Sequence, residues 1–116
     1  MVPQISYFYD IINRNAIVIK PKKPFLDWIN KLDPLNPITD LDEGTIYLIK
    51  EKDSNEEIEK WLKRNFEKIF QNELNDWHTY ENDWPQKRTF KLFKEWFGYE
   101  IHSMVLDIEE THIEKN

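Results

Sequence analysis

The sequence of 116 residues contains no cysteine, only two glycines and no hydrophobic run long enough to cross a membrane. The lack of cysteine excludes disulfides, thiolate catalysis and cysteine-based zinc sites. The shortage of glycine excludes a Gly-rich loop of the kind that cradles phosphates. Cationic side chains are also outnumbered, and the formal net charge of −6 argues against a general binder of DNA or of anionic membranes. We therefore expect no nucleic-acid partner and no membrane partner.

Aromatic residues are abundant, with seven Phe, five Tyr and five Trp. Disordered chains are poor in such side chains, so the composition indicates a folded protein. The length suits one domain with a substantial core, and we treat residues 1–116 as that domain. Residues 1–12 are either an added strand or a surface arm, and residues 109–116 are a polar tail. The N-terminus lacks the basic region and cleavage site of a secretory signal, so we expect a cytoplasmic protein.

Hydropathy patterns predict three strands. Residues 16–20 and residues 45–50 are short apolar runs rich in β-branched side chains, and proline, glycine or charged residues bound them. Residues 99–108 are apolar at both odd and even positions. Because a strand that is apolar on both faces is often covered on both, this third strand is predicted to be central.

The first predicted helix spans residues 24–32, where apolar residues recur at intervals of four and three. A proline-containing loop over residues 33–44 follows it. Within that loop, Thr39 is placed to cap a single helical turn that includes Leu41.

The second helix, residues 55–74, has the most regular pattern. Ser54 begins a capping box, and one face is apolar except for two glutamates, Glu59 and Glu73. The third helix carries an aromatic face, and either Asp83 or Thr89 can cap its start. Gly98 is predicted to end it in a left-handed conformation.

The element order is β-α-β-α-α-β. Three strands with helical connections predict an α+β domain, or a small α/β domain, in which helices cover a three-stranded sheet.

Two long blocks of sequence resemble a family of small, uncharacterised bacterial proteins. They are NRNAIVIKPKKPFLDWIN near the start and WPQKRTFKLFKEWFGYEIHSMVLD near the end, and the resemblance spans residues 13–107. It implies a compact intracellular domain. It carries no activity, cofactor or catalytic residue to this chain, and residues 1–12 lie outside it.

Residues 75–84 form an acidic, aromatic connector between the second and third helices. Trp77, Tyr80 and Trp84 fall outside helical core spacing there, and Arg88 follows shortly after. Loops lie mostly at the surface, and Trp, Tyr and Arg dominate the energetics of protein interfaces. These residues are therefore our candidate recognition patch. The alternative is that both tryptophans fold back onto the core beside the third helix.

Charge is unevenly distributed around this connector. Residues 72–83 carry four acidic side chains and no cation, whereas residues 85–94 carry four cations and no acid. The two stretches either pair with each other or present their charge to a partner. An acidic surface suits a basic protein through electrostatic steering.

Few residues are placed for catalysis or metal binding. His102 and Ser103 are neighbours on a predicted strand, so their side chains point to opposite faces and cannot pair. His78 lies near Glu81 and Asp83 without the spacing of a metal motif. Three lysines between residues 20 and 23 either hold a phosphate at a helix N-terminus or form a solvated strand end.

These observations favour a binding protein over an enzyme. We predict a non-enzymatic protein-interaction module, monomeric or weakly homodimeric, with a basic protein partner and with no cofactor, metal or catalytic residue. The alternative is a small enzyme or ligand-binding domain that uses a pocket near His102. The candidate binding residues are Trp77, His78, Tyr80, Trp84, Arg88 and His102.

Overall fold

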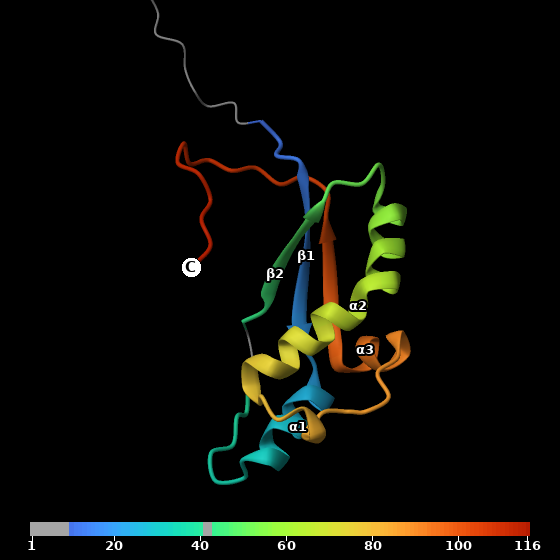
Figure 1. Cartoon of the computed structure of the whole chain (residues 1–116), viewed down its shortest axis with the longest axis vertical. Coiled ribbons are helices and arrows are strands. Elements are labelled where there is room, and N and C mark those ends of the chain that lie inside the picture. The colour runs from blue at the N-terminus through green and yellow to red at the C-terminus, as the bar shows by residue number, and fades with distance from the viewer. Residues whose placement is uncertain (1–9, 41–42) are drawn as a thin grey trace, which may run out of the picture.

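The computed structural model describes residues 10–40 and 43–116 as an α+β domain with a three-stranded antiparallel sheet and three helices (Figure 1). The predicted element order and fold class are confirmed, and the antiparallel pairing selects α+β over α/β. The elements are β1 (Arg14–Pro21), α1 (Lys23–Leu32), β2 (Thr45–Lys50), α2 (Asn55–Trp77), the 3-10 turn η1 (Glu81–Asp83), α3 (Phe90–Trp96) and β3 (Phe97–His102).

The strand order is β2-β1-β3, so β1 lies in the centre and β3 at one edge. In the register, Ile17 of β1 lies opposite Tyr47 of β2 and Ile101 of β3. The prediction that the third strand is central was wrong, and β3 ends at His102, well before residue 108. The pattern misled because the chain leaves the sheet there, and the apolar Met104 beyond it is 66% exposed.

The N-terminal arm pairs with the segment that follows β3. Ile11 forms an isolated antiparallel bridge with Leu106, and the Ile12 amide donates to the Val105 carbonyl at 2.8 Å. Residues 10–12 are therefore an arm joined to the C-terminal segment, and they add no strand to the named sheet. The rest of the predicted N-terminal element, residues 1–9, lies outside the described residues.

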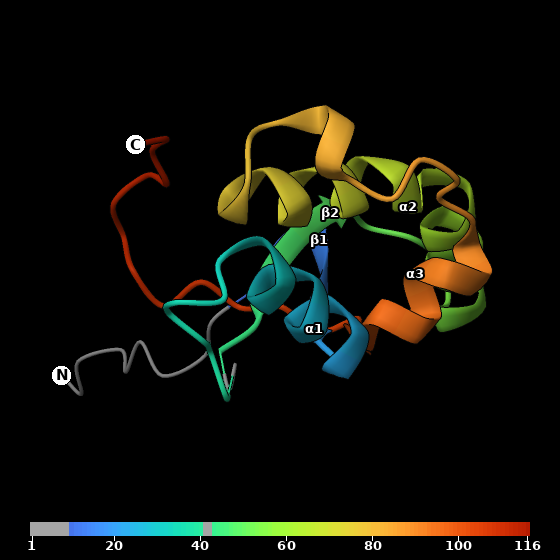
Figure 2. The same cartoon turned by 90° about the horizontal axis from the view of Figure 1, so that it is seen from below.

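The two faces of the sheet differ. Viewed from one end, the helices gather on one side of the sheet, while the C-terminal tail lies on the other (Figure 2). Toward the helices, alternate residues such as Ile17, Ile19 and Ile49 are buried. Toward the tail, Ile46 and Leu48 of β2 remain 66% and 46% exposed.

Four phenylalanines form the centre of the core. Phe25, Phe70, Phe93 and Phe97 are all 0–1% exposed. The ring of Phe97 lies 5.0–5.4 Å, centroid to centroid, from the other three. Each such ring buries enough apolar surface to contribute about 1.5–3 kcal/mol. The first residue of β3 thus joins α1, α2 and α3 at one point.

The predicted starts of α2 and α3 are confirmed, and the structure decides between the two candidate caps of α3. The Ser54 hydroxyl accepts from the Glu57 amide at 3.2 Å, and α2 continues to Trp77, beyond its predicted end. At α3 the cap is Thr89, whose hydroxyl accepts from the Leu92 amide at 3.1 Å. Of the two candidates for this cap, Asp83 belongs to η1 instead.

The predicted left-handed glycine at the end of α3 was wrong. Gly98 lies inside β3, and no glycine of the described chain has a positive φ. The helix ends because Phe97, with φ −136° and ψ 140°, is already extended and buried in the core. The predicted turn after Thr39 includes Leu41, which lies outside the described residues.

Gly44 precedes β2, and a Cβ atom there would meet the Ile19 carbonyl oxygen at 2.6 Å. The close approach of this loop to β1 therefore requires glycine. Across residues 10–40 and 43–116, we find no helix with the combined length and hydrophobicity needed to span a bilayer.

Candidate functional site

The connector between α2 and α3 is a compact loop closed by its own polar groups. His78 Nε2 lies 2.8 Å from Asp83 Oδ2, and the Asp83 amide donates to the Tyr80 carbonyl at 3.1 Å. These contacts join the two ends of the loop around η1. The connector therefore has a defined shape before any partner arrives.

Two tryptophan indoles hold this loop to the body of the protein. Trp28 of α1 donates from Nε1 to the Asp83 carbonyl at 3.0 Å, and its ring lies edge-on to His78. Trp84 donates from Nε1 to the His78 carbonyl at 2.7 Å and is only 6% exposed. Trp84 therefore packs on the core and is not part of an exposed patch. This is the alternative that the sequence left open for both tryptophans.

Trp77 and Tyr80 remain at the surface. Trp77 is the last residue of α2 and is 46% exposed, whereas Tyr80 lies in the loop and is 56% exposed. The Tyr80 hydroxyl accepts from Asn82 Nδ2 at 2.8 Å. For Trp77 the sequence left surface and core open, and the structure places it at the surface. The two tryptophans of the connector therefore have opposite roles.

Trp77 and His78 also line a cavity of about 220 Å³ that they share with α1 and the loop after it. The loop is held by a pair of bonds between Asn30 and Ile38: the Asn30 amide nitrogen donates at 2.8 Å, and its oxygen accepts at 2.7 Å. The sequence did not reveal this wall of the cavity, because Asn36 and Ile38 are distant from Trp77 along the chain and no local motif marks them. The lining residues are Ile29, Leu32, Asp33, Asn36, Ile38, Trp77 and His78.

The rim and surroundings of this cavity carry acidic charge. Asp33 lines it, and the exposed Asp76 immediately precedes Trp77 near the end of α2. Residues 72–86 contain no Lys or Arg, but Glu81 lines a separate small cavity together with Arg88. Leu35, in the loop that forms one wall, is 90% exposed. We call Leu35, Trp77, Tyr80 and this cavity the connector surface.

Arg88 does not belong to the connector surface. Its Nε and Nη2 atoms each lie 2.7 Å from Glu67 Oε1 on α2, and Nη1 donates to the Pro85 carbonyl. The guanidinium group also lies 5.8 Å from the centroid of the Trp84 ring. Arg88 thus clamps the start of α3 to α2. Its charge is matched by Glu67.

His102 lies on the outer face of the sheet, opposite Ala16. Its side chain is 56% exposed, with Nε2 at 3.4 Å from Glu100 Oε2. This contact and the nearby Lys20 hold the pKa of Glu100 below its usual value. The fold does not bring His102 to the connector, and His102 does not line the cavity beside Trp77.

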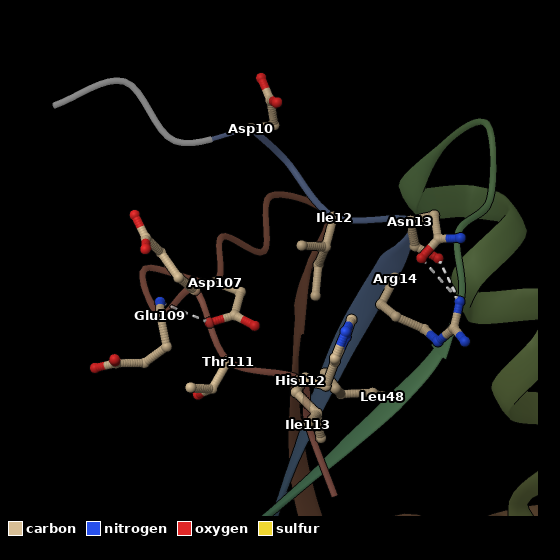
Figure 3. Close-up of a pocket in the computed structure, with 11 residues that line it drawn as sticks. Asp10, Ile12, Asn13, Arg14, Leu48, Asp107, Glu109, Thr111, His112 and Ile113 are labelled. Carbon is tan, nitrogen blue, oxygen red and sulfur yellow. Dashed lines mark hydrogen bonds between the residues drawn. The ribbon is translucent and has the colours of Figure 1, made fainter. Parts of the chain in front are cut away.

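A larger cavity of about 610 Å³ lies between the sheet and the C-terminal tail (Figure 3). Figure 3 shows His112 and Ile113 of the tail beside Leu48, with Arg14 near the sheet end. His102 does not line this cavity either. Several carboxylates do, but in the described part of the chain no three metal-ligating side chains come together.

The two glutamates on the apolar face of α2 each bind a tyrosine of the sheet. Glu73, 6% exposed, accepts from the Tyr47 hydroxyl of β2, and Glu59 accepts from the Tyr99 hydroxyl of β3 at 2.8 Å. Burial, with a smaller contribution from Asp76, raises the pKa of Glu73. Burial and the bond to Glu59 raise the pKa of Tyr99 to about 12.

Comparisons with protein-family models, with curated proteins and with solved structures give no match to this chain. The resemblance to a family of small bacterial proteins therefore stays a prediction.

Proposed function

We propose that this chain is a non-enzymatic protein-binding module and that the connector surface takes a basic segment of a partner through one apolar anchor residue. One observation carries the proposal: a half-exposed tryptophan, Trp77, forms the wall of a cavity whose other walls include Ile29, Leu32 and Ile38. Aromatic side chains beside a small apolar pocket are typical of the energetic centre of a protein interface.

The size of the cavity favours a side chain over a cofactor. Pockets that enclose small-molecule ligands usually have volumes of about 300–1,000 Å³. The cavity beside Trp77, at about 220 Å³, is smaller than that range. A leucine or phenylalanine side chain is the kind of group that it suits.

The connector is also preorganised. The bonds of Trp28, Trp84 and His78 hold its backbone, and Asn30 holds the opposite wall. A surface that is ordered before binding avoids the entropy cost of ordering itself in the complex. This rigidity supports recognition of a segment that fits a fixed shape.

The charge around the connector surface indicates the chemistry of the partner. Asp33 lines the cavity, and Asp76 immediately precedes Trp77 in the chain. Residues 72–86 contain no Lys or Arg, and the whole chain carries −6. Lysine and arginine residues that flank the anchor would meet these carboxylates at the polar rim. Such complementarity mainly speeds association and selects among partners.

A titration followed by NMR tests the proposal. The probe is a short peptide with one leucine among lysines and arginines, and its matched control has glutamate at every cationic position. We expect the basic peptide to shift the Trp77 indole and His78 signals and the control peptide to leave them unchanged. Shifts that occur elsewhere, or equal binding of both peptides, would contradict the proposal.

Two variants separate binding from folding. Trp77→Ala should abolish the shifts at His78 while the chain stays folded with only a small decrease in its urea midpoint, because Trp77 is half exposed. Met104→Ala, at an exposed apolar residue outside the connector surface, should bind like the parent chain. If Trp77→Ala binds the basic peptide as well as the parent does, the connector surface is not the site.

A further inference from the structure

The outward edge of β2 carries backbone groups that are not used by β1. The Glu51 amide donates to the Asn13 carbonyl, which identifies this opposed pair as a hydrogen-bonded pair of the antiparallel ladder. Such pairs alternate along antiparallel strands. Thr45, Tyr47 and Ile49 therefore bond to β1, whereas the amides and carbonyls of the residues between them point away from it. Those outward residues are Ile46, Leu48 and Lys50.

The side chains of these outward residues do not protect the edge. Natural edge strands are usually guarded by charge, proline, a bulge or a covering segment. β2 has no proline, keeps an unbroken register with β1 from Thr45 to Lys50, and carries charge only at its last residue. Ile46 and Leu48 remain exposed on the outer face of the sheet.

We infer that β2 pairs antiparallel with β2 of a second copy of this chain, about a two-fold axis at Tyr47, to give a continuous six-stranded sheet. A two-fold axis perpendicular to the sheet keeps each side chain on its own face, so opposed residues must have the same parity. With Tyr47 on the axis, Ile46 lies opposite the second copy's Leu48. Lys50 lies opposite the second copy's Gly44, which has no side chain.

This register is self-complementary in both backbone and side chains. Ile46 and Leu48 have outward amides and carbonyls, so each opposed Ile46–Leu48 pair exchanges two hydrogen bonds. Their side chains then form one apolar stripe across both copies on the outer face. A foreign strand would also find the backbone groups, but only a second copy supplies this matched pairing by symmetry.

The contact is small, so the dimer is weak. Six residues of edge strand fall short of the interface of about 1,200–2,000 Å² that stable complexes usually bury. The dimer should therefore populate only at high protein concentration, and the chain should be monomeric when dilute.

Amide hydrogen exchange at two protein concentrations tests the pairing residue by residue. In dilute protein the amides of Ile46, Leu48 and Lys50 should exchange fast, and at high concentration they should become protected. The amides of Tyr47 and Ile49 should be protected in both samples. Unchanged exchange at Ile46 and Leu48, in a sample that sedimentation shows to be dimeric, would place the interface elsewhere and overturn the inference.

Introducing a lysine at an exposed isoleucine, once inside and once outside the proposed interface, gives a matched pair of variants. Ile46→Lys should raise the dissociation constant about tenfold, because symmetry changes two cross-strand pairs at once. Ile108→Lys makes the same change at an exposed residue that does not line the cavity beside Leu48, and it should leave the dissociation constant unchanged. Sedimentation equilibrium measures the dissociation constants of both variants. A parent chain that stays monomeric at millimolar concentration, or equal effects of the two variants, would overturn the inference.

Discussion

The two edge strands of the sheet meet solvent in different ways. On the outer face β2 presents Ile46 and Leu48, whereas β3 presents Glu100 and His102. The start of β3 is also covered, because the Phe97 amide donates to Phe93 of α3. In this chain β3 continues directly from α3, which covers its first residue, whereas β2 follows a loop and has no helix at its start.

The same strands differ in how they hold α2. Tyr47 of β2 binds the buried Glu73, and Tyr99 of β3 binds Glu59 at the surface. A buried carboxylate without a donor is costly, whereas water replaces a lost donor at an exposed one. The bond on the β2 side therefore matters more for stability, although the two pairs consist of the same residue types.

The largest difference between the edges should appear when their apolar residues are shortened. Phe97→Ala at the start of β3 should lower the free energy of unfolding by about 3–5 kcal/mol, because it opens a cavity among four buried rings. Leu48→Ala on β2 should cost less than about 1 kcal/mol, since nearly half of that side chain is already in water. Urea unfolding measures both, and similar losses would show that β2 is covered after all.

The tyrosine–glutamate pairs should give a smaller contrast. Tyr47→Phe should cost about 1–3 kcal/mol because it removes the main donor to a buried carboxylate. Tyr99→Phe should cost below about 1 kcal/mol because its partner is exposed. Circular dichroism during urea unfolding gives both values. The reverse order would mean that Glu73 finds another donor when Tyr47 is shortened.

The smallest effect concerns pH. Burial raises the pKa of Glu73 above its usual 4.5, so the folded chain binds that proton more tightly than the unfolded chain does. The stability linked to this proton is present below about pH 4.5 and is lost as the pH rises through the raised pKa.

The variant Glu73→Gln isolates this contribution, because all other acidic groups are common to both chains. The difference in unfolding free energy, parent minus variant, should fall as the pH rises from 4 toward 7. A difference that is constant with pH would show that folding does not raise the pKa of Glu73, and one that increases would show that the carboxylate is stabilised in the folded state.

Local patterns in the sequence were enough for much of the fold. β2 has the predicted bounds, and Ser54 caps the helix it was expected to cap. These features depend on period-two or helical spacing and on hydrogen bonds within three residues. The end of α3 was harder because Gly98 resembles a helix terminator, while the actual end depends on the burial of Phe97 among three helices.

The candidate site was only partly predictable for the same reason. The sequence indicated an aromatic connector but left open whether its tryptophans lie at the surface or on the core, and the structure exposes Trp77 and Tyr80. It could not separate Trp77 from Trp84, because the indole of Trp84 finds its acceptor at His78 only when the connector folds back. The wall of the cavity formed by the loop around Ile38 had no signal in the sequence.

The sequence by itself therefore determined the elements, their order, the acidic balance and the aromatic character of the connector. The tertiary structure alone decided which tryptophan is buried, which edge of the sheet is bare, and that Glu59 and Glu73 are partners of two tyrosines. The physical reason is the separation along the chain over which each interaction acts. Helical and strand periodicity act between near neighbours, whereas the burial of an indole or a carboxylate depends on groups that are brought together from distant parts of the chain.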